Sequence, residues 1–297
     1  MSWPEGFRSG IVAVVGRPNV GKSTLVNALV GQKVAIVSDK PQTTRRDIRA
    51  IWNVEGAQVV FTDTPGYHKP KTLLGARLND LVGDAVEGVD LVIQVVDAAA
   101  GIGPGDAFVY EQKVRPTGAT AICAVNKVDA VKGHGEVPQL TAAGELGSFD
   151  EVVPLSAKMG KGVGLLRDLI IERMPEGPPL YPPDDVTDQS IETRLAEVIR
   201  EKALQVTHQE VPHSIAVVLD ELEREEGLVK VHASLIVERE SQKGIVIGKG
   251  GQTLKTIGSR ARGEMELLLG SKVFLDMHVK VFKEWQRDPR ALERLGF

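Results

Sequence analysis

Eight consecutive residues near the start of the chain have the types and spacing of a phosphate-binding loop. They fit the pattern G-x-x-x-x-G-K-[S/T] and precede Thr24: Gly16, Arg17, Pro18, Asn19, Val20, Gly21, Lys22 and Ser23. Glycines let backbone N–H groups close around phosphate oxygens, the lysine reaches the β and γ phosphates, and the serine ligates Mg²⁺. The pattern predicts a nucleoside triphosphate site formed by these residues and Thr24, with Lys22 catalytic and Ser23 on the metal. An incidental glycine-rich turn is the alternative.

An acidic turn follows about forty residues downstream: Asp63, Thr64, Pro65 and Gly66. An aspartate at the end of a strand can hold Mg²⁺, and the glycine can offer its N–H to the γ-phosphate. We assign all four residues to nucleotide binding, Asp63 to the metal and Gly66 to catalysis. Such a turn is common by itself and gains its meaning from the preceding loop.

The polar stretch 38–47 lies between these two motifs and has no periodicity. It is typical of a mobile loop with a threonine that ligates Mg²⁺ only when the γ-phosphate is present, so that hydrolysis releases the loop. We favour Thr44 over Thr43 as this metal ligand and catalytic residue. An ordinary solvated loop is the alternative.

A third motif predicts which base is bound: Asn126, Lys127, Val128 and Asp129. The carboxylate of Asp129 can accept hydrogen bonds from two N–H groups that guanine has and adenine lacks, and an unmatched polar pair is costly. Lys127 would lie along the purine face and Asn126 would brace the loop. A backbone N–H for the guanine carbonyl is expected from the tripeptide Ser156, Ala157 and Lys158.

Together these motifs resemble the translation-factor-like class of GTPases over residues 10 to 175. Many of its members have a glutamine directly after the acidic turn to orient the attacking water, and here Tyr67 holds that place. The resemblance therefore implies weak hydrolysis by the isolated protein. A backbone group, a bound partner, or K⁺ held near Asn19 as in potassium-stimulated relatives would position the water.

A fourth motif, G-x-x-G, lies in the last third of the chain. Glycines let a nucleic-acid backbone approach, helix N-terminal N–H groups and lysine meet phosphates, and apolar side chains floor a groove for bases. We expect a strand before the motif, a helix after it, and a floor of Ile245, Ile247 and Ile257. The predicted RNA-binding residues are Ile247, Gly248, Lys249, Gly250, Gly251 and Lys255. A helix cap with a solvated basic face is the alternative.

Charge is unevenly distributed along the 297 residues. Residues 1–238 contain 24 Lys and Arg against 33 Asp and Glu, whereas residues 239–297 contain 12 against 7. Only the C-terminal part therefore has the charge of an anion-binding domain. The single cysteine, Cys123, lies in an apolar run, which fits a reducing cytosol. No targeting segment, membrane span or histidine–cysteine zinc pattern is expected.

The elements that must position these residues predict two domains. Apolar runs alternate with helical stretches through the first half, which indicates a doubly wound, mostly parallel α/β sheet with an antiparallel hairpin around Glu55-Gly56. A helix, paired strands, a second helix and a closing strand indicate an α+β domain after a proline-rich segment. We expect an α/β P-loop GTPase domain over 1–178, a linker over 179–188 and an α+β KH domain over 189–297.

This combination, with the loop Pro41-Gln42-Thr43-Thr44-Arg45, resembles the Era family of bacterial ribosome-assembly GTPases across nearly the whole chain. The resemblance implies a cytoplasmic monomer that uses GTP/GDP and Mg²⁺, binds the 3′ end of 16S rRNA and the small ribosomal subunit, and contacts the inner membrane peripherally. The alternatives are an RNA-binding protein in which GTP only regulates affinity, and a membrane-associated regulatory GTPase. A tRNA-modifying GTPase would need a cofactor domain.

Overall fold

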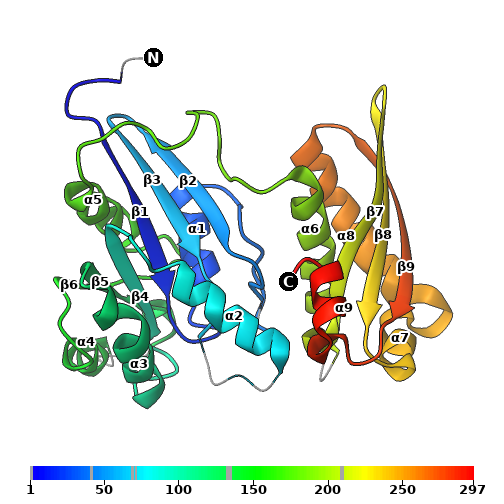
Figure 1. Cartoon of the computed structure of the whole chain (residues 1–297), viewed down its shortest axis with the longest axis horizontal. Coiled ribbons are helices and arrows are strands. Elements are labelled where there is room, and N and C mark those ends of the chain that lie inside the picture. Colours follow the sequence, from blue (N-terminus) through cyan, green and yellow to red (C-terminus); the bar gives the residue numbers. More distant parts are fainter. Residues whose placement is uncertain (1–2, 41–42, 68–69, 71, 132–135, 208–210) are drawn as a thin grey trace. The chain divides into compact units, whose positions relative to one another are not determined.

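The computed structural model describes residues 3–40, 43–67, 70, 72–131, 136–207 and 211–297. The chain divides into two compact units with separate cores (Figure 1). The first unit comprises Met1–Ala35, Thr44–Pro70 and Gly75–Asp188, and the second comprises Ile36–Thr43, Lys71–Leu74 and Gln189–Phe297. Two short segments of the N-terminal sequence thus belong to the second unit.

A six-stranded sheet with strand order β2-β3-β1-β4-β5-β6 forms the centre of the first unit (Figure 1). Strand β2 runs antiparallel to β3 as the predicted hairpin, and the other neighbouring pairs are parallel. The strands are β1 (Arg8–Val15), β2 (Ile48–Val54), β3 (Ala57–Asp63), β4 (Leu91–Asp97), β5 (Thr120–Asn126) and β6 (Glu151–Pro154). The predicted mostly parallel α/β fold is confirmed.

Helices cover both faces of this sheet because its central strands are apolar on both sides. In β1, Val12 and Val14 pack with side chains of α1 and α5, whereas Ala13 and Val15 pack on the other face with side chains of α2 and α3. The helices are α1 (Lys22–Val30), α2 (Leu73–Asp84), α3 (Pro104–Val109), α4 (Glu136–Glu145) and α5 (Val163–Arg173).

The parallel strands bring the sequence motifs to one edge of the sheet. The phosphate-binding loop follows β1, Asp63 ends β3, Asn126 ends β5, and Ser156 comes just after β6. Carboxyl ends of parallel strands share an edge, which is where ligands bind in open α/β sheets. Four segments that are far apart in sequence therefore meet there.

The second unit has a three-stranded sheet, β7-β8-β9, in which β8 pairs antiparallel with β7 and parallel with β9. Alternate residues of β8 pack against α6 and α8, and Trp285 is fully buried. The elements are β7 (Ala216–Glu225), β8 (Leu228–Val237), β9 (Lys272–Val281), α6 (Ile191–Val206), α7 (Glu240–Ile247), α8 (Gln252–Leu269) and α9 (Pro289–Arg294). The unit is the predicted α+β domain.

The expectation of a strand directly before G-x-x-G is wrong, because helix α7 occupies that place. Gln242 and Val246, one helical turn apart, are its buried residues, and the Gln242 Oε1 accepts hydrogen bonds from the N–H groups of Glu238 and Arg239. This cap starts a helix where the apolar run Ile245–Ile247 alone suggested a strand. The motif therefore joins two helices.

The proline-rich segment is hydrogen-bonded to the first unit. Gln58 Oε1 accepts from the N–H groups of Leu180 (2.6 Å) and Tyr181 (2.8 Å), and Gln58 Nε2 donates to the Tyr181 carbonyl. The predicted linker thus runs along the hairpin of β2 and β3 before the second unit begins at Gln189. Among the described residues, no helix is both long and apolar enough to cross a membrane.

Candidate nucleotide site and RNA groove

The loop after β1 has positive φ at Gly16 (155°), Asn19 (65°) and Gly21 (100°). A Cβ at Gly21 would lie 2.3 Å from Asn126 Nδ2, so a larger residue would push the loop off the end of β5. The Asn126 amide also donates to the Val20 carbonyl at 2.9 Å. These contacts fix the loop immediately before helix α1, whose N-terminus presents its backbone N–H groups.

Lys22 is a buried cation whose ammonium group donates to backbone carbonyls of its own loop. Its Nζ donates to the carbonyls of Gly16 (3.1 Å) and Arg17 (3.0 Å), and the residue is 7% exposed. Burial lowers the pKa of Lys22 to about 8, and the nearby Asp63 opposes that shift. A bound phosphate group would supply a negative charge next to the buried ammonium group of Lys22 and so stabilise its charged form.

Three oxygens converge beside this lysine. The hydroxyls of Ser23 and Thr44 are 2.9 Å apart, and Thr44 Oγ1 donates to Asp63 Oδ2 at 3.3 Å. Burial raises the pKa of Asp63 to about 6, opposed by hydrogen bonds from Ser23 and Thr44 and by the charge of Lys22. Asp63 Oδ1 is buried without a hydrogen-bond partner among the described residues. Hydroxyl and carboxylate oxygens with an unused lone pair fit Mg²⁺, which prefers oxygen ligands.

The two candidate threonines of the 38–47 loop have different surroundings. The Thr43 hydroxyl is hydrogen-bonded to Ser38 Oγ at 2.7 Å and donates to the Lys40 carbonyl at 2.6 Å. Thr44, in contrast, contacts Ser23 and Asp63. The geometry supports our preference for Thr44.

Gly66 lies too close to the phosphate-binding loop for any side chain. A Cβ there would approach Pro18 Cα to 2.7 Å, and the N–H of Tyr67 donates to the Gly16 carbonyl at 3.3 Å. Thr64 fixes the same turn by donating its hydroxyl to the Val14 carbonyl at 2.8 Å. The acidic turn is therefore bound to the loop, with the Gly66 N–H beside it.

Tyr67, at the position where many GTPases have glutamine, packs against the first unit. Its ring stacks on Phe108 with centroids 5.5 Å apart, and Lys113 Nζ lies 4.7 Å from the ring centroid. An aromatic ring held in this way leaves water positioning to other groups.

Asn126 links three of the motifs. Besides its bond to Val20, its Oδ1 accepts from the N–H of Ala157 at 3.0 Å. The N–H of Ser156 donates to the Lys161 carbonyl, so Ser156 and Ala157 brace this loop and Lys158 is its exposed residue. Of the expected tripeptide, Lys158 therefore has the N–H best placed to remain available for a base.

Lys127 and Asp129 follow in a strained turn. Lys127 has φ 64°, and its Nζ donates to the Asn19 carbonyl and to Asp97 Oδ2, both at 2.6 Å. Asp129 is exposed in the 3₁₀ turn Val128–Ala130. Sequence reasoning missed Asp97, which ends β4 and fixes Lys127; its position at a strand end next to the motif strand was the available signal.

The G-x-x-G turn has positive φ at Gly248 (75°), Gly250 (60°) and Gly251 (78°). A Cβ at Gly248 would lie 2.2 Å from Thr253 Oγ1, whereas Gly250 and Gly251 face open space. Lys249 is exposed at the tip of the turn. The backbone is thus accessible at the N-terminus of α8, as binding to a phosphate chain requires.

A groove of about 440 Å³ runs beside α8 and β9. Its lining contains two cations and no carboxylate: Gly251, Leu254, Lys255, Gly258, Ser259, Arg262, Leu275 and Met277. None of the three isoleucines predicted for the floor lines this groove. Ile257 is fully buried in the core, Ile247 packs partly buried against it, and Ile245 is half exposed. Ile257 faces the core and the next residue, Gly258, lines the groove, so the core face and the groove face of α8 differ by one position. The sequence alone does not distinguish the two faces. The apolar lining residues Leu254, Leu275 and Met277 were not predicted.

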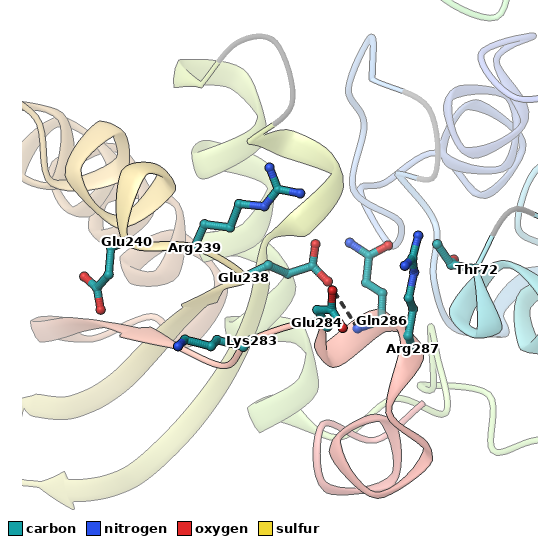
Figure 2. A pocket seen from close by; sticks show the side chains of 8 residues that line it. All are labelled: Thr72, Glu238, Arg239, Glu240, Lys283, Glu284, Gln286 and Arg287. Carbon is teal, nitrogen blue, oxygen red and sulfur yellow. Dashed lines mark hydrogen bonds between the residues drawn. The ribbon is translucent and has the colours of Figure 1, made fainter.

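Another pocket of the second unit, of about 540 Å³, has a different character (Figure 2). Three carboxylates lie among three cations in its lining, which comprises Thr72, Glu238, Arg239, Glu240, Lys283, Glu284, Gln286 and Arg287. The charges cancel, so this pocket has no preference for a polyanion. The groove along α8 is the candidate RNA interface.

Comparison with known proteins agrees with this geometry. Residues 11–127 match the family described as 50S ribosome-binding GTPase, and residues 210–286 match the KH domain family. The chain is 52% identical to GTPase Era of Mycobacterium tuberculosis over 98% of this chain and 99% of that protein. It is 51% identical to GTPase Era of Mycolicibacterium smegmatis with the same coverage. The chain belongs to the GTPase Era family.

Solved structures of Era have the same fold over nearly the whole chain. An Aquifex aeolicus Era variant bound to GDP and AlF₄⁻ matches with a TM-score of 0.94 and 38% identity over 97% of this chain and 99% of that chain. Era in complex with MgGDPNP and nucleotides 1506–1542 of 16S ribosomal RNA matches with a TM-score of 0.95 and 38% identity over 98% and 99%. The predicted family, fold class and GTPase activity are confirmed, and neither alternative function is favoured.

Proposed function

We propose that this protein is a GTP-hydrolysing switch that binds the 3′ end of 16S rRNA through the groove along α8 and acts in small-subunit assembly. The observation that carries the proposal is the convergence of Ser23, Thr44 and Asp63 beside buried Lys22, in a chain that also has a basic G-x-x-G groove. The relative crystallised with MgGDPNP and 16S rRNA nucleotides supports the same pairing of ligands. The domain limits 1–178, 179–188 and 189–297 belong to the proposal.

Each residue of the nucleotide site has its own role in GTP binding and hydrolysis. Ser23, Thr44 and Asp63 would hold Mg²⁺, which when bound neutralises charge on the phosphates. Lys22 binds the β and γ phosphates, and the Gly66 N–H donates to the γ-phosphate as it is transferred. Water attacks in line at the γ-phosphorus, giving GDP and phosphate. Asp129 accepts from guanine, and Asn126 and Lys127 hold its turn.

The pKa of Asp63 predicts a pH limit on Mg²⁺ binding. Burial raises that pKa to about 6, and a metal ligand must be ionised, so Mg²⁺ affinity should fall as the pH drops through about 6 and be constant above about 7. The measurement is the Mg²⁺ concentration for half-maximal GTP turnover between pH 5 and 8. Asp63→Asn is the control, because it keeps the titration of GTP and removes that of Asp63. Equal pH dependence in both proteins would contradict the assignment.

The proposal is tested by GTP turnover in a four-way assay, with or without an RNA containing 16S nucleotides 1506–1542, in KCl or NaCl. We expect RNA and K⁺ each to raise turnover by roughly tenfold, because Tyr67 cannot replace the water-positioning glutamine and a cation near Asn19 would stabilise transition-state charge. An identical rate in all four conditions would refute both parts. Monomeric state and peripheral inner-membrane contact follow from family resemblance and are part of the proposal.

A further inference from the structure

Helix α6 has an unusual run of seven consecutive buried residues, from Val198 to Leu204. A helix that packs against one core buries only one stripe, and Leu195, Ile199 and Ala203 form that stripe here. The run also contains Arg200, Glu201 and Lys202, which are 1%, 2% and 9% exposed. Buried charges are costly unless paired, so something must cover and satisfy the second side of this helix.

The segment Ile36–Thr43, which belongs to the second unit, provides that partner through its described residues. The backbone N–H of Val37 donates to Glu201 Oε1 at 2.8 Å, and Arg200 Nη2 donates to the Thr43 carbonyl. Two charged side chains of α6 therefore bind backbone groups at the two ends of this loop. The sequence pattern gave no sign of this, since a charged triplet on a helix ordinarily faces solvent.

The remaining charges hold these two side chains in place. Glu197 binds Arg200 through both carboxylate oxygens, at 2.9 Å and 2.6 Å. Lys202 Nζ is 2.5 Å from Glu201 Oε2 and also pairs with Glu264 of α8. Because each group has its partner before it meets the loop, Arg200 and Glu201 are preorganised to bind it. Lys202 joins this arrangement to the helix that begins at the G-x-x-G turn.

The loop ends next to the candidate metal ligand. Thr43, whose carbonyl accepts from Arg200, is followed in the chain by Thr44, whose hydroxyl contacts Ser23 and Asp63. A shift of the Thr43 carbonyl must move the next peptide unit and so displace the Thr44 hydroxyl. The contacts to α6 thus constrain the position of Thr44.

We propose that Arg200 and Glu201 form a latch on the Ile36–Thr43 segment and are positioning residues that keep Thr44 in the metal site. The inference rests on the proposed role of Thr44 and adds two side chains of α6 to the residues that govern GTP hydrolysis. Because the latched loop coincides with Thr44 beside Ser23 and Asp63, the latched state is the hydrolytically competent one.

The test compares three variants of the full chain. Glu201→Ala removes the acceptor for Val37, and we expect kcat for GTP to fall roughly tenfold with KM changed less than about threefold. Glu201→Gln keeps a carbonyl acceptor but loses the charge, so it should restore most of kcat. Glu192→Ala removes an exposed carboxylate from the first turn of α6, outside the latch and its supporting charges, so its kcat should be close to that of the wild type. Amide hydrogen exchange at Val37 should quicken only in Glu201→Ala.

The outcomes separate the latch from general instability. The latch is wrong if Glu201→Ala keeps wild-type kcat and Val37 exchange, or if Glu192→Ala loses as much activity as Glu201→Ala. Thr44→Ala is measured in parallel to test the proposed function. Unchanged turnover in Thr44→Ala would overturn the metal assignment and the latch with it, whereas reduced turnover in Thr44→Ala but not in Glu201→Ala would overturn the latch alone.

Discussion

Replacing Asp129 with asparagine is expected to weaken binding of GDP and GTP by roughly 100-fold or more and to transfer the preference to xanthosine nucleotides. The carboxylate accepts from two N–H groups of guanine, and an amide offers one acceptor and one donor, so a donor faces a donor. Xanthine has an oxygen where guanine has its amine and restores the match. Asp129 is exposed in the turn Val128–Ala130, so the change should leave the fold intact.

The experiment is a competition titration with GDP, XDP and ADP. Asp168→Asn, on the exposed side of α5, is the matched control, since it makes the same chemical change outside the motifs. We expect GDP affinity to be kept in the control and lost in Asp129→Asn, with XDP gained. Unaltered GDP affinity in Asp129→Asn would remove the base assignment.

Replacing Gly248 and Gly251 together with aspartate is expected to lower RNA affinity by at least roughly 100-fold and leave GDP affinity within about twofold. Both glycines have positive φ, and a Cβ at Gly248 would collide with Thr253 at the start of α8. Two carboxylates at this helix N-terminus would also repel the phosphates that its N–H groups attract. The loss combines a blocked approach with charge repulsion.

Backbone strain is controlled with single variants. Gly251→Asp and Gly270→Asp both place a side chain at positive φ in open space, one at each end of α8. We expect RNA binding, measured by fluorescence anisotropy with the 1506–1542 fragment, to fall in the first and persist in the second. Equal losses would mean that the strain on α8, and not the binding surface, caused the effect.

The nucleotide site was largely predictable because its chemistry is local in sequence. Each motif is contiguous, and the strands carry the phosphate-binding loop, Asp63, Asn126 and Ser156 to one edge of the sheet. The confirmed fold class follows from the same alternation of apolar runs and helices. The separate role of each site residue stays a prediction, supported by contacts such as those of Asn126 with Val20 and Ala157.

The errors occurred where tertiary contacts outweigh local pattern. The apolar run Ile245–Ile247 reads as a strand, yet the cap from Gln242 makes it a helix, and Ile257 is in the core instead of the groove floor. The burial of Arg200 and Glu201 against a loop more than 150 residues earlier was not predicted, because a charged pair on a helix ordinarily faces solvent. Such pairings depend on packing between residues far apart in the chain, which the hydrophobic periodicity of a single sequence does not show. Pro41 and Gln42, part of the family-like loop, lie outside the described residues.

The central claim is that loop amides, Lys22 and the Mg²⁺ ligands bind a triphosphate while Asp129 selects guanine. Calorimetric titration of the purified chain with GDPNP and with the corresponding ATP analogue, both in Mg²⁺, tests it most directly. We expect the guanine analogue to bind at least roughly 100-fold tighter than the adenine analogue. Equal affinity for the two would contradict it.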